Sequence, residues 1–415
     1  MTLRVENIGS LEALDAASWN AAAGEIYPFL RHEFLATLEA TGCASVETGW
    51  QPDHLVVYRG DAVVAVLPRY AKFHSRGEYV FDWAWADAWE RAGGDYYPKS
   101  LCAIPFTPAA GPRLGVRPDE SRREVMAALA PYLVGTGMVS WHLLFAESDE
   151  VADWRETFEA PLMERHAVQF AWRDDGFGDF EGFLGRMSSR KRKEIRRERR
   201  KVEEQGFTFA RLTGEAIDDD ALAHFFRCYC MTYLERGQRP YLTLEFFTRL
   251  RDRLADSMLL VQAIHQGRLV AAALCFEGRS DEGHGRLFGR YWGSEVEADF
   301  LHFETCYYQG IEHCLETGLD YFDPGTQGEH KLTRGFSPTL SRSLHYLDHQ
   351  GFRDAVADFC AEERAYVQTY LTQCEQRLPF KTGGDAKQVP NKPMSDEPMS
   401  DEPVPDEPAP RRPTS

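Results

Sequence analysis

The sequence lacks the features that mark membrane-spanning, secreted and disulfide-stabilised proteins. None of its 415 residues falls in a run that approaches the roughly 20 apolar residues a membrane helix needs. Residues 1–7 contain no cationic segment followed by an apolar one, so we expect no secretory signal peptide. The nine cysteines form no C-x-x-C pair, which argues against a zinc ribbon or a disulfide framework. We therefore expect a cytoplasmic protein with reduced thiols and no membrane span.

Motifs of several enzyme classes are also absent. The sequence contains no Walker A loop, no dinucleotide-binding glycine fingerprint, no G-x-S-x-G elbow and no H-E-x-x-H pair. Acidic residues outnumber basic ones, and the formal net charge is −18. That balance disfavours general binding to nucleic acids.

The charge is unevenly distributed along the chain, and one segment is strongly basic. Residues 186–201 contain ten Lys or Arg and only two acids, a local charge of +8. No Gly or Pro occurs between Arg186 and Gln205, so residues 183–204 should form one mostly solvent-facing helix. This helix is either a salt-bridged surface helix or a site for an external anion, tRNA included. Because two acids cannot pair ten cations, most of the charge should stay open to an anion, and we name Arg190, Lys191 and Arg192 as contacts.

Composition and repeats divide the chain into parts. From about Lys381 onward, Pro, Asp, Glu, Ser and Met dominate, so residues 379–415 should be a disordered tail. Residues 29–38 and 241–250 match in their aromatic, Leu, Glu-Phe and closing Leu positions. Each copy is followed by a hairpin, a helix ended by Gly and a strand, at residues 54–67, 122–134 and 138–145 and at residues 259–274, 301–316 and 319–323. We expect an α/β fold with domains at 1–165 and 207–378, joined by a connecting segment at 166–206.

A glycine-rich loop follows the last of these strands. Residues 325–336 contain three glycines, a Glu-His pair and two cations, Lys331 and Arg334. Glycines let the backbone approach a ligand closely, and the cations can meet an anion there. Gln327, Gly328 and His330 lie in the same loop, which favours function. The alternative is a polar turn that carries solvated charges.

Two further segments combine aromatic and charged residues. In the first, Lys99 and Arg113 could hold a carboxylate or phosphate, with Phe106 as an apolar wall; the alternative is a rigid linker with Phe106 packed inward. In the second, Trp83, Trp85 and Trp89 alternate in a way that suggests a half-buried strand, and core packing is favoured over sugar stacking.

Several motifs together resemble one bacterial family. They are Tyr97-Pro98-Lys99, Pro105-Phe106-Thr107-Pro108 with Gly111 and Arg113, the basic run 191–198, Gly289-Arg290-Tyr291-Trp292-Gly293, Leu301-His302-Phe303-Glu304, Tyr307-Tyr308 and residues 327–331. Over residues from about 20 to 375 the chain is similar to FemAB-like N-acyltransferases, a family linked to peptidoglycan biosynthesis or recognition, within the GNAT superfamily. The resemblance implies tandem GNAT-like domains with mixed, twisted sheets flanked by helices. It also implies no tightly bound cofactor and a co-substrate that is acyl-CoA or aminoacyl-tRNA. A full CoA pyrophosphate loop is not present, since Tyr291 and Trp292 occupy its neighbourhood.

Acyl transfer to an amine needs a group that accepts the proton of the amine. The candidate bases are His330, Glu304 and Glu329. Glu304 and His302 lie near the start of a helix that Asp299 should cap, where a carboxylate could also serve simply as a cap. The spacing of these histidines and carboxylates fits no metal site, so we expect no metal.

The sequence thus favours an enzyme that moves an acyl or aminoacyl group to an amine of a small molecule or peptide, in cell-envelope metabolism. The residues expected to bind substrate or donor are Lys99, Phe106, Arg113, Arg190, Lys191, Arg192, Tyr291, Trp292, His302, Gln327, Gly328, Lys331 and Arg334. The alternative is a non-catalytic binding protein for an anionic envelope precursor or a nucleic acid. The oligomeric state is not indicated.

Overall fold

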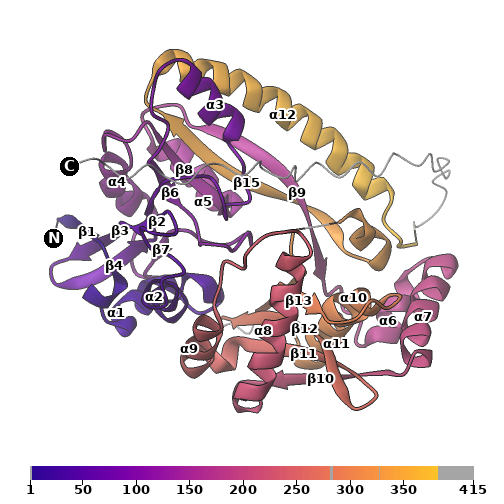
Figure 1. Cartoon of the computed structure of the whole chain (residues 1–415). Coiled ribbons are helices and arrows are strands. Elements are labelled where there is room, and N and C mark those ends of the chain that lie inside the picture. Colours follow the sequence, from indigo (N-terminus) through magenta and orange to yellow (C-terminus); the bar gives the residue numbers. More distant parts are fainter. Residues whose placement is uncertain (1, 281–283, 327, 382–415) are drawn as a thin grey trace. The chain divides into compact units, whose positions relative to one another are not determined.

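A long mixed sheet runs through the chain in the computed structural model, which describes residues 2–280, 284–326 and 328–381 (Figure 1). Its strand order is β10-β11-β12-β13-β14-β9-β15-β8-β6-β5-β2, and a smaller sheet has the order β1-β3-β4-β7. The strands are β1 Leu3–Ile8, β2 Trp50–Pro52, β3 His54–Arg59, β4 Ala62–Leu67, β5 Tyr70–Lys72, β6 Lys99–Cys102, β7 Gly115–Val116, β8 Ser140–Ala146, β9 Met163–Arg173, β10 Phe207–Thr213, β11 Met258–His265, β12 Arg268–Arg279, β13 Gly285–Ser294, β14 Tyr321–Asp323 and β15 Ser337–Leu347.

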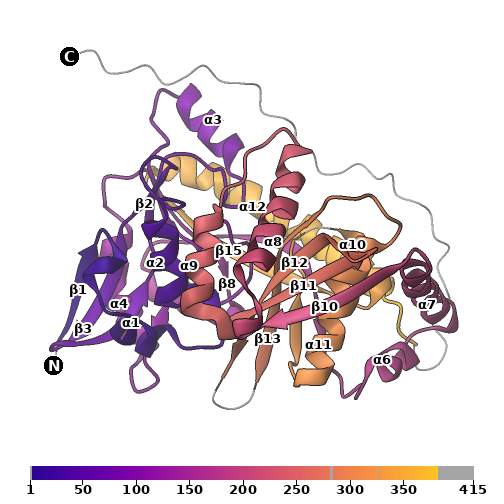
Figure 2. The same ribbon diagram turned by 60° about the horizontal axis from the view of Figure 1, so that its bottom comes forward.

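Helices flank these sheets. They are α1 Ala16–Ala23, α2 His32–Ala40, α3 Trp83–Arg91, α4 Arg122–Leu133, α5 Ser148–Thr157, α6 Phe180–Arg186, α7 Ser189–Glu204, α8 Asp219–Leu234, α9 Leu244–Leu254, α10 Leu301–Phe303, α11 Gln309–Thr317 and α12 Gln350–Gln376. A π-helical segment, Glu304–Tyr308, joins α10 to α11. Figure 2 shows α8 lying across β12 and β13. Within the described residues, none of the helices is long and apolar enough to cross a membrane.

Each half of the chain has the expected GNAT-like order of helix, hairpin, helix and strand. The hairpins form as β3–β4 and β11–β12, because β-branched and apolar runs flank a turn with Gly60 or Gly267 at positive φ. In both halves a strand pairs in parallel with an earlier one, β8 with β6 and β14 with β13. The predicted α/β fold of two GNAT-like units is confirmed. The tail prediction concerns residues that, from 382 onward, lie outside the described part.

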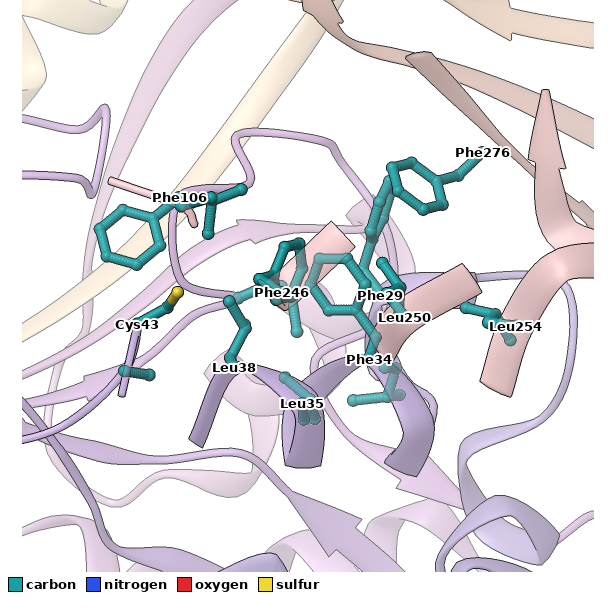
Figure 3. Packing of buried hydrophobic residues seen from close by; sticks show 14 of the residues in the cluster. Phe29, Phe34, Leu35, Leu38, Cys43, Phe106, Phe246, Leu250, Leu254 and Phe276 are labelled. Carbon is teal, nitrogen blue, oxygen red and sulfur yellow. The ribbon is translucent and has the colours of Figure 1, made fainter. Parts of the chain in front are cut away.

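The repeated segments of the sequence meet in the core. Phe34 of α2 and Phe246 of α9 occupy equivalent positions in the two copies, and their rings lie edge to face, 5.8 Å apart at 89°. Figure 3 shows this contact among buried side chains of both helices. Such an aromatic pair contributes about 0.5–1.5 kcal/mol beyond the area it buries. The internal duplication therefore places like residues against each other between the halves.

The two halves also share the long sheet. Strand β15, from the C-terminal half, lies between β9 and β8 and pairs antiparallel with both. Strand β9 in turn pairs with β14, so it crosses the expected boundary at residue 165 without a break in the sheet. The domain limits predicted from the sequence remain a prediction.

Two predicted elements are wrong. Residues 83–91 form helix α3 rather than a strand: Trp85 and Trp89, four residues apart, face α12, where Trp89 stacks on Phe352 at 5.0 Å. The spacing of two between Trp83 and Trp85 was misleading, since Trp83 points outward and stacks on Phe81. The basic helix is also interrupted, because Met187 adopts extended φ and ψ and ends α6 before α7 begins.

Candidate active site

Strands β13 and β14 run side by side for three residue pairs and then separate. The last pair is Phe288 with Asp323, after which β13 continues to Ser294 beside β12. Pro324 and Gly325, the latter at φ +99°, turn the chain away from the sheet. Among the described residues no strand pairs with the edge of β13 beyond this point. A split of this kind offers an extended ligand a place beside a strand edge.

A bulge in β13 directs a cation into this region. Cys275 pairs with Gly289 and Leu274 with Tyr291, so Arg290 is an extra residue in β13. Bulges re-aim side chains and are frequent next to active sites. The Nε and Nη1 atoms of Arg290 are buried and find no hydrogen-bond partner in the described part of the protein. Buried guanidinium nitrogens without hydrogen-bond acceptors are atoms that a bound anion would stabilise.

Asp323 and Lys331 lie close to Arg290. Asp323 is 3% exposed and accepts a hydrogen bond from the Gly325 amide at 2.8 Å. Burial raises the pKa of Asp323, against the pull of the Arg290 and Lys331 cations. Lys331 donates to the Gly325 carbonyl, and burial together with Arg290 lowers its pKa to about 8, although Asp323 opposes the shift. Two cations and one carboxylate leave this group with one excess positive charge.

An imidazole lies beside the same loop. His330 belongs to the 3-10 segment Glu329–Arg334, and its Nε2 is 2.8 Å from the Tyr307 hydroxyl. Burial and the nearby cations lower the pKa of His330 to about 4, so the ring is neutral at pH 7. His302 lies between this ring and Trp292 of β13, with ring centroids 6.1 and 5.3 Å away. The structure thus brings four of the predicted residues, His302, Trp292, His330 and Lys331, into one neighbourhood.

A cavity of about 140 Å³ opens over β13. Its lining is mostly aromatic and comes from β13, α8, the segment after α8 and the loop before α3. The lining residues are Tyr79, Tyr229, Thr232, Tyr233, Arg236, Gln238, Tyr241, Arg290, Tyr291 and Trp292. Tyr291 and Trp292, both predicted from the sequence, therefore line a pocket beside the strand split.

A family model matches residues 10–382, and its description is peptidoglycan biosynthesis/recognition. The chain belongs to this FemAB-like family. Among solved structures it is similar to FemX, at 14% identity and a TM-score of 0.48 over 85% of this chain and 100% of that one. It is also similar to L-PGS from Bacillus licheniformis, at 12% identity and a TM-score of 0.46 over 79% and 94% of the two chains. No curated protein sequence matches it.

Family membership confirms the resemblance seen in the sequence motifs. It links this FemAB-like chain to peptidoglycan biosynthesis or recognition. A third similar structure is a tandem GNAT protein from the clavulanic acid biosynthesis pathway, at 10% identity and a TM-score of 0.42 over 83% of this chain and 98% of that one.

Two predicted bases of this FemAB-like chain are held by other side chains. Glu304 is 3% exposed and accepts from Arg199 Nε and Nη2 at 3.0 and 2.9 Å. Its helix begins after Phe300 at positive φ, not at Asp299 as predicted. Glu329 accepts from Tyr370 at 2.6 Å and from Arg377 at 2.7 Å, at the far end of α12. Both carboxylates therefore serve the fold, and we do not propose either as the base.

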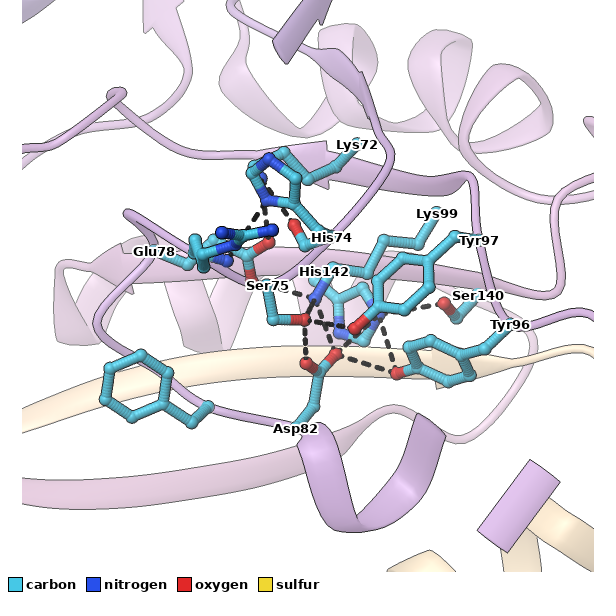
Figure 4. A network of polar contacts seen from close by, with 12 residues as sticks. Lys72, His74, Ser75, Glu78, Asp82, Tyr96, Tyr97, Lys99, Ser140 and His142 are labelled. Carbon is cyan, nitrogen blue, oxygen red and sulfur yellow. Dashed lines mark hydrogen bonds and ion pairs between the residues drawn. The ribbon is translucent and has the colours of Figure 1, made fainter. Parts of the chain in front are cut away.

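The predicted anion contacts of the N-terminal half are likewise occupied. Lys99 is 1% exposed and donates to Ser75, Glu78 and Asp82 at 2.8, 2.8 and 2.6 Å (Figure 4). Arg113 donates to backbone carbonyls, among them those of Leu144 and Ala109 at 2.7 Å. Both cations donate their hydrogen bonds to acceptors within the protein, so we do not propose them as ligand contacts.

The remaining predicted loop residues shape the loop or connect it to α7. Phe106 stacks on Tyr241 at 4.8 Å, which is the inward packing considered as its alternative. At Gly328, φ is +98° and a Cβ would meet the His330 ring at 1.9 Å, so only glycine fits. Arg334 donates to Glu198 of α7 through Nη2 at 2.7 Å. Gln327 lies outside the described residues.

Helix α7 has more ion-pair partners than the sequence suggested. Acids outside the basic window supply many of them, as when Arg199 binds Glu312. The cations of the window that form ion pairs are Arg186, Lys191, Arg196, Arg199, Arg200 and Lys201. Arg190, Arg192, Lys193 and Arg197 form none with other described residues, so the expectation that most of the charge stays open is wrong.

The described part of the chain contains one group able to hold a metal, and it lies apart from the residues considered in the sequence. His224, Cys228 and Glu295 have ligand atoms within 4.8 Å of one another. Burial raises the pKa of Cys228 to about 12, which opposes the thiolate that a metal needs. Glu295 also pairs with Arg227 at 3.3 Å. We therefore derive no metal site from this group.

The sequence motifs contained two candidate site residues that were not singled out from the sequence. Arg290 stands within the glycine-flanked run 289–293, and Asp323 ends the last strand before Pro324. A charged residue at the end of an apolar strand, just before a Pro-Gly turn, was the available signal for Asp323. Nothing in the sequence marked Arg290 as the bulged residue, because a bulge depends on the register with β12.

Proposed function

We propose that this FemAB-like protein is an N-acyltransferase that moves an acyl or aminoacyl group from an activated donor to an amine. The observation that carries the proposal is the separation of β13 from β14, with Arg290, Asp323 and Lys331 converging at the point of separation. A carboxylate and two cations in a shielded site supply a proton acceptor and stabilisation for developing negative charge.

The reaction would use these groups in the following way. The amine nitrogen attacks the acyl carbon, and Asp323 accepts the proton that the nitrogen loses. Negative charge that develops on the carbonyl oxygen is stabilised by Lys331, whose ammonium is already oriented by the Gly325 carbonyl. The bond from the acyl carbon to the donor's sulfur or oxygen then breaks, and the proton passes to that leaving group. An amide and a thiol or hydroxyl are the products.

His330 is an alternative candidate for the base that accepts the amine proton. Its ring is neutral at pH 7 and its Nε2 contacts the Tyr307 hydroxyl at 2.8 Å. We assign it to positioning, because Asp323 lies among the groups at the strand split itself. Replacing His330 by Gln should therefore reduce kcat less than replacing Asp323 by Asn does.

Between the two donors, the unpaired cations of α7 favour aminoacyl-tRNA. Arg190, Lys193 and Arg197 are exposed and lie three and four residues apart, on one face of α7. They span about 10 Å at 1.5 Å per residue, which suits a polynucleotide backbone. On another face of α7, Glu198 accepts a hydrogen bond from Arg334 of the segment Glu329–Arg334. We place the reaction in the cytoplasm, where aminoacyl-tRNA and acyl-CoA are both made.

Reversing this charge should separate the donors. The triple variant Arg190→Glu/Lys193→Glu/Arg197→Glu should weaken aminoacyl-tRNA binding by at least about 10-fold. The slope of the logarithm of the binding constant against the logarithm of the salt concentration should fall by the equivalent of roughly two to three released counterions. Acetyl-CoA binding should change little. The measurement is filter binding across a salt series for the tRNA and calorimetry for the CoA.

The matched control for the α7 variant is Arg117→Glu/Arg123→Glu/Arg249→Glu, which makes the same charge change at exposed sites elsewhere. Equal weakening by both variants would contradict a specific role for α7. Tight acetyl-CoA binding without tRNA binding would instead assign the donor as acyl-CoA.

The rival function is a binding protein without turnover, for an anionic envelope precursor. Its support is the excess positive charge at Arg290 and Lys331, which would attract an anion with or without catalysis. Incubating the full-length protein with each donor and a peptide amine, and analysing the peptide by mass spectrometry, tests the proposal. An acylated peptide is expected, and donor binding without any product would favour the rival.

A further inference from the structure

We infer that the cavity over β13 binds a carboxylate of the acceptor, held by Arg290, with the terminal residue packed between aromatic rings. The inference rests on the proposed function, since that function names the ligand as an acceptor. It assigns the acceptor a second required group besides its amine. A peptide with a free C-terminus has both.

Two nitrogen atoms of the cation in this cavity have no hydrogen-bond partner among the described residues. Arg290 lines the cavity, and its Nε and Nη1 atoms are buried without a hydrogen-bond acceptor in the described part of the chain. This contrasts with Arg113 and Arg334, whose guanidinium groups are bound to carbonyls or to Glu198. Buried donors without acceptors are rare in folded proteins and are costly unless a ligand satisfies them.

Charge balance favours a singly charged anion. Arg290 and Lys331 carry two positive charges, and Asp323 compensates one of them. A carboxylate would complete the balance, whereas a phosphate dianion would leave one negative charge in excess in a shielded place. Arg236, at the rim of the cavity, is exposed, so water already solvates its charge.

The walls of the cavity suit a small apolar residue attached to that carboxylate. Tyr229, Tyr233, Tyr291 and Trp292 supply ring surfaces, which bury aliphatic groups well and lose little conformational entropy. At about 140 Å³, the cavity has room for the side chain of one small terminal residue. Tyr79, from the N-terminal half, also lines the cavity, so both halves would contact the acceptor.

A matched pair of peptides tests the inference on the full-length protein. The tripeptide Ala-Lys-Ala and its C-terminal amide differ only in the carboxylate and are titrated by calorimetry. The acid should bind about 10- to 100-fold more tightly than the amide, the ratio expected for a charge-assisted hydrogen bond. Arg290→Met should reduce this ratio to below about threefold, and Arg290→Lys should retain part of it.

The control is Arg286→Met, on the same strand four residues earlier, where the side chain pairs with Glu147 at 2.7 Å. It should leave the preference for the acid intact. Equal binding of acid and amide, a preference that persists in Arg290→Met, or no binding of the acid at about 10 mM would each overturn the carboxylate site.

These outcomes are distinguishable from failure of the proposed function. If the protein acylates the amide peptide as readily as the acid, the transferase stands and the carboxylate site falls. If it prefers the acid but forms no product with either donor, the carboxylate site stands and the transferase falls.

Discussion

Replacing Asp323 by Asn should lower kcat for acyl transfer by about 10²- to 10⁴-fold, the usual contribution of a general base. The amide preserves the size of the side chain and can still accept a hydrogen bond from the Gly325 amide. The donor should remain bound, because the substitution leaves its proposed contacts on α7 unchanged. Single-turnover rates and donor dissociation constants, measured on the same preparations, separate an effect on the chemical step from an effect on donor binding.

The pH dependence of kcat provides an independent readout for Asp323. A base works only when ionised, so the rate falls as the pH falls through its pKa. Because burial raises the pKa of Asp323, this acid limb should lie above the range of an ordinary aspartate, and it should be absent in Asp323→Asn. The control is Asp320→Asn. Asp320 is an exposed carboxylate three residues earlier that pairs with His284, and its replacement should leave both kcat and the acid limb of the pH profile unchanged. Loss of activity in Asp320→Asn, or an unchanged rate in Asp323→Asn, would exclude this assignment.

Replacing Lys99 by Met should destabilise the protein by about 3–5 kcal/mol, as expected when one partner of a buried ion pair is removed. Lys99 is the cation between Glu78 and Asp82, which are each 3% exposed or less. Although burial raises the pKa of Asp82, Lys99 and His142 hold it well below the usual value. Methionine would leave two buried carboxylates without that charge. Urea denaturation followed by tryptophan fluorescence measures the change in the free energy of unfolding.

The cost of Lys99→Met should depend on pH in a defined direction. Burial raises the pKa of Glu78 to about 7 even with Lys99 present, so Glu78 protonates readily as the pH falls. Its protonation removes one of the uncompensated charges, and the variant should be closer to wild type at pH 5 than at pH 8. Lys193→Met, on the exposed face of α7, should change stability by less than about 0.5 kcal/mol. A Lys99→Met protein as stable as wild type at pH 8 would show that the lysine is dispensable to the fold.

The sequence was informative where structure is decided locally. The hairpins at Gly60 and Gly267 and the helix that ends at Gly318 follow from turn and cap chemistry. The basic segment was predicted to be one helix. Met187 adopts an extended conformation that ends α6, and the amino-acid composition of the segment does not indicate this break. The strand prediction for residues 83–91 relied on the spacing of two between Trp83 and Trp85. The spacing of four between Trp85 and Trp89, which is typical of a helix, was not given enough weight.

The site depended on contacts that are distant in the sequence. Arg290 is bulged only because of its register with β12, and Asp323 meets it only because β14 pairs with β13. Lys99 was predicted to contact a ligand. In the structure it forms ion pairs with Glu78 and Asp82, which lie about twenty residues earlier in the sequence. Glu304 was expected to be a catalytic base or a helix cap, and Arg199 from α7 binds it instead. The structure brings several of the motif residues together, and their hydrogen-bond and ion-pair partners determine which side chains remain available to a ligand.

The most direct test of the account is a transfer experiment with the full-length protein. Radiolabelled aminoacyl-tRNA and, separately, labelled acetyl-CoA are mixed with excess protein and the peptide Ala-Lys-Ala, and the label in the peptide is followed with time. We predict that label passes into an amide of the peptide with at least one donor, and that Asp323→Asn slows the transfer without weakening donor binding. Binding of a donor with no labelled peptide, for wild type and variant alike, would contradict the proposal that the split between β13 and β14 is a catalytic site.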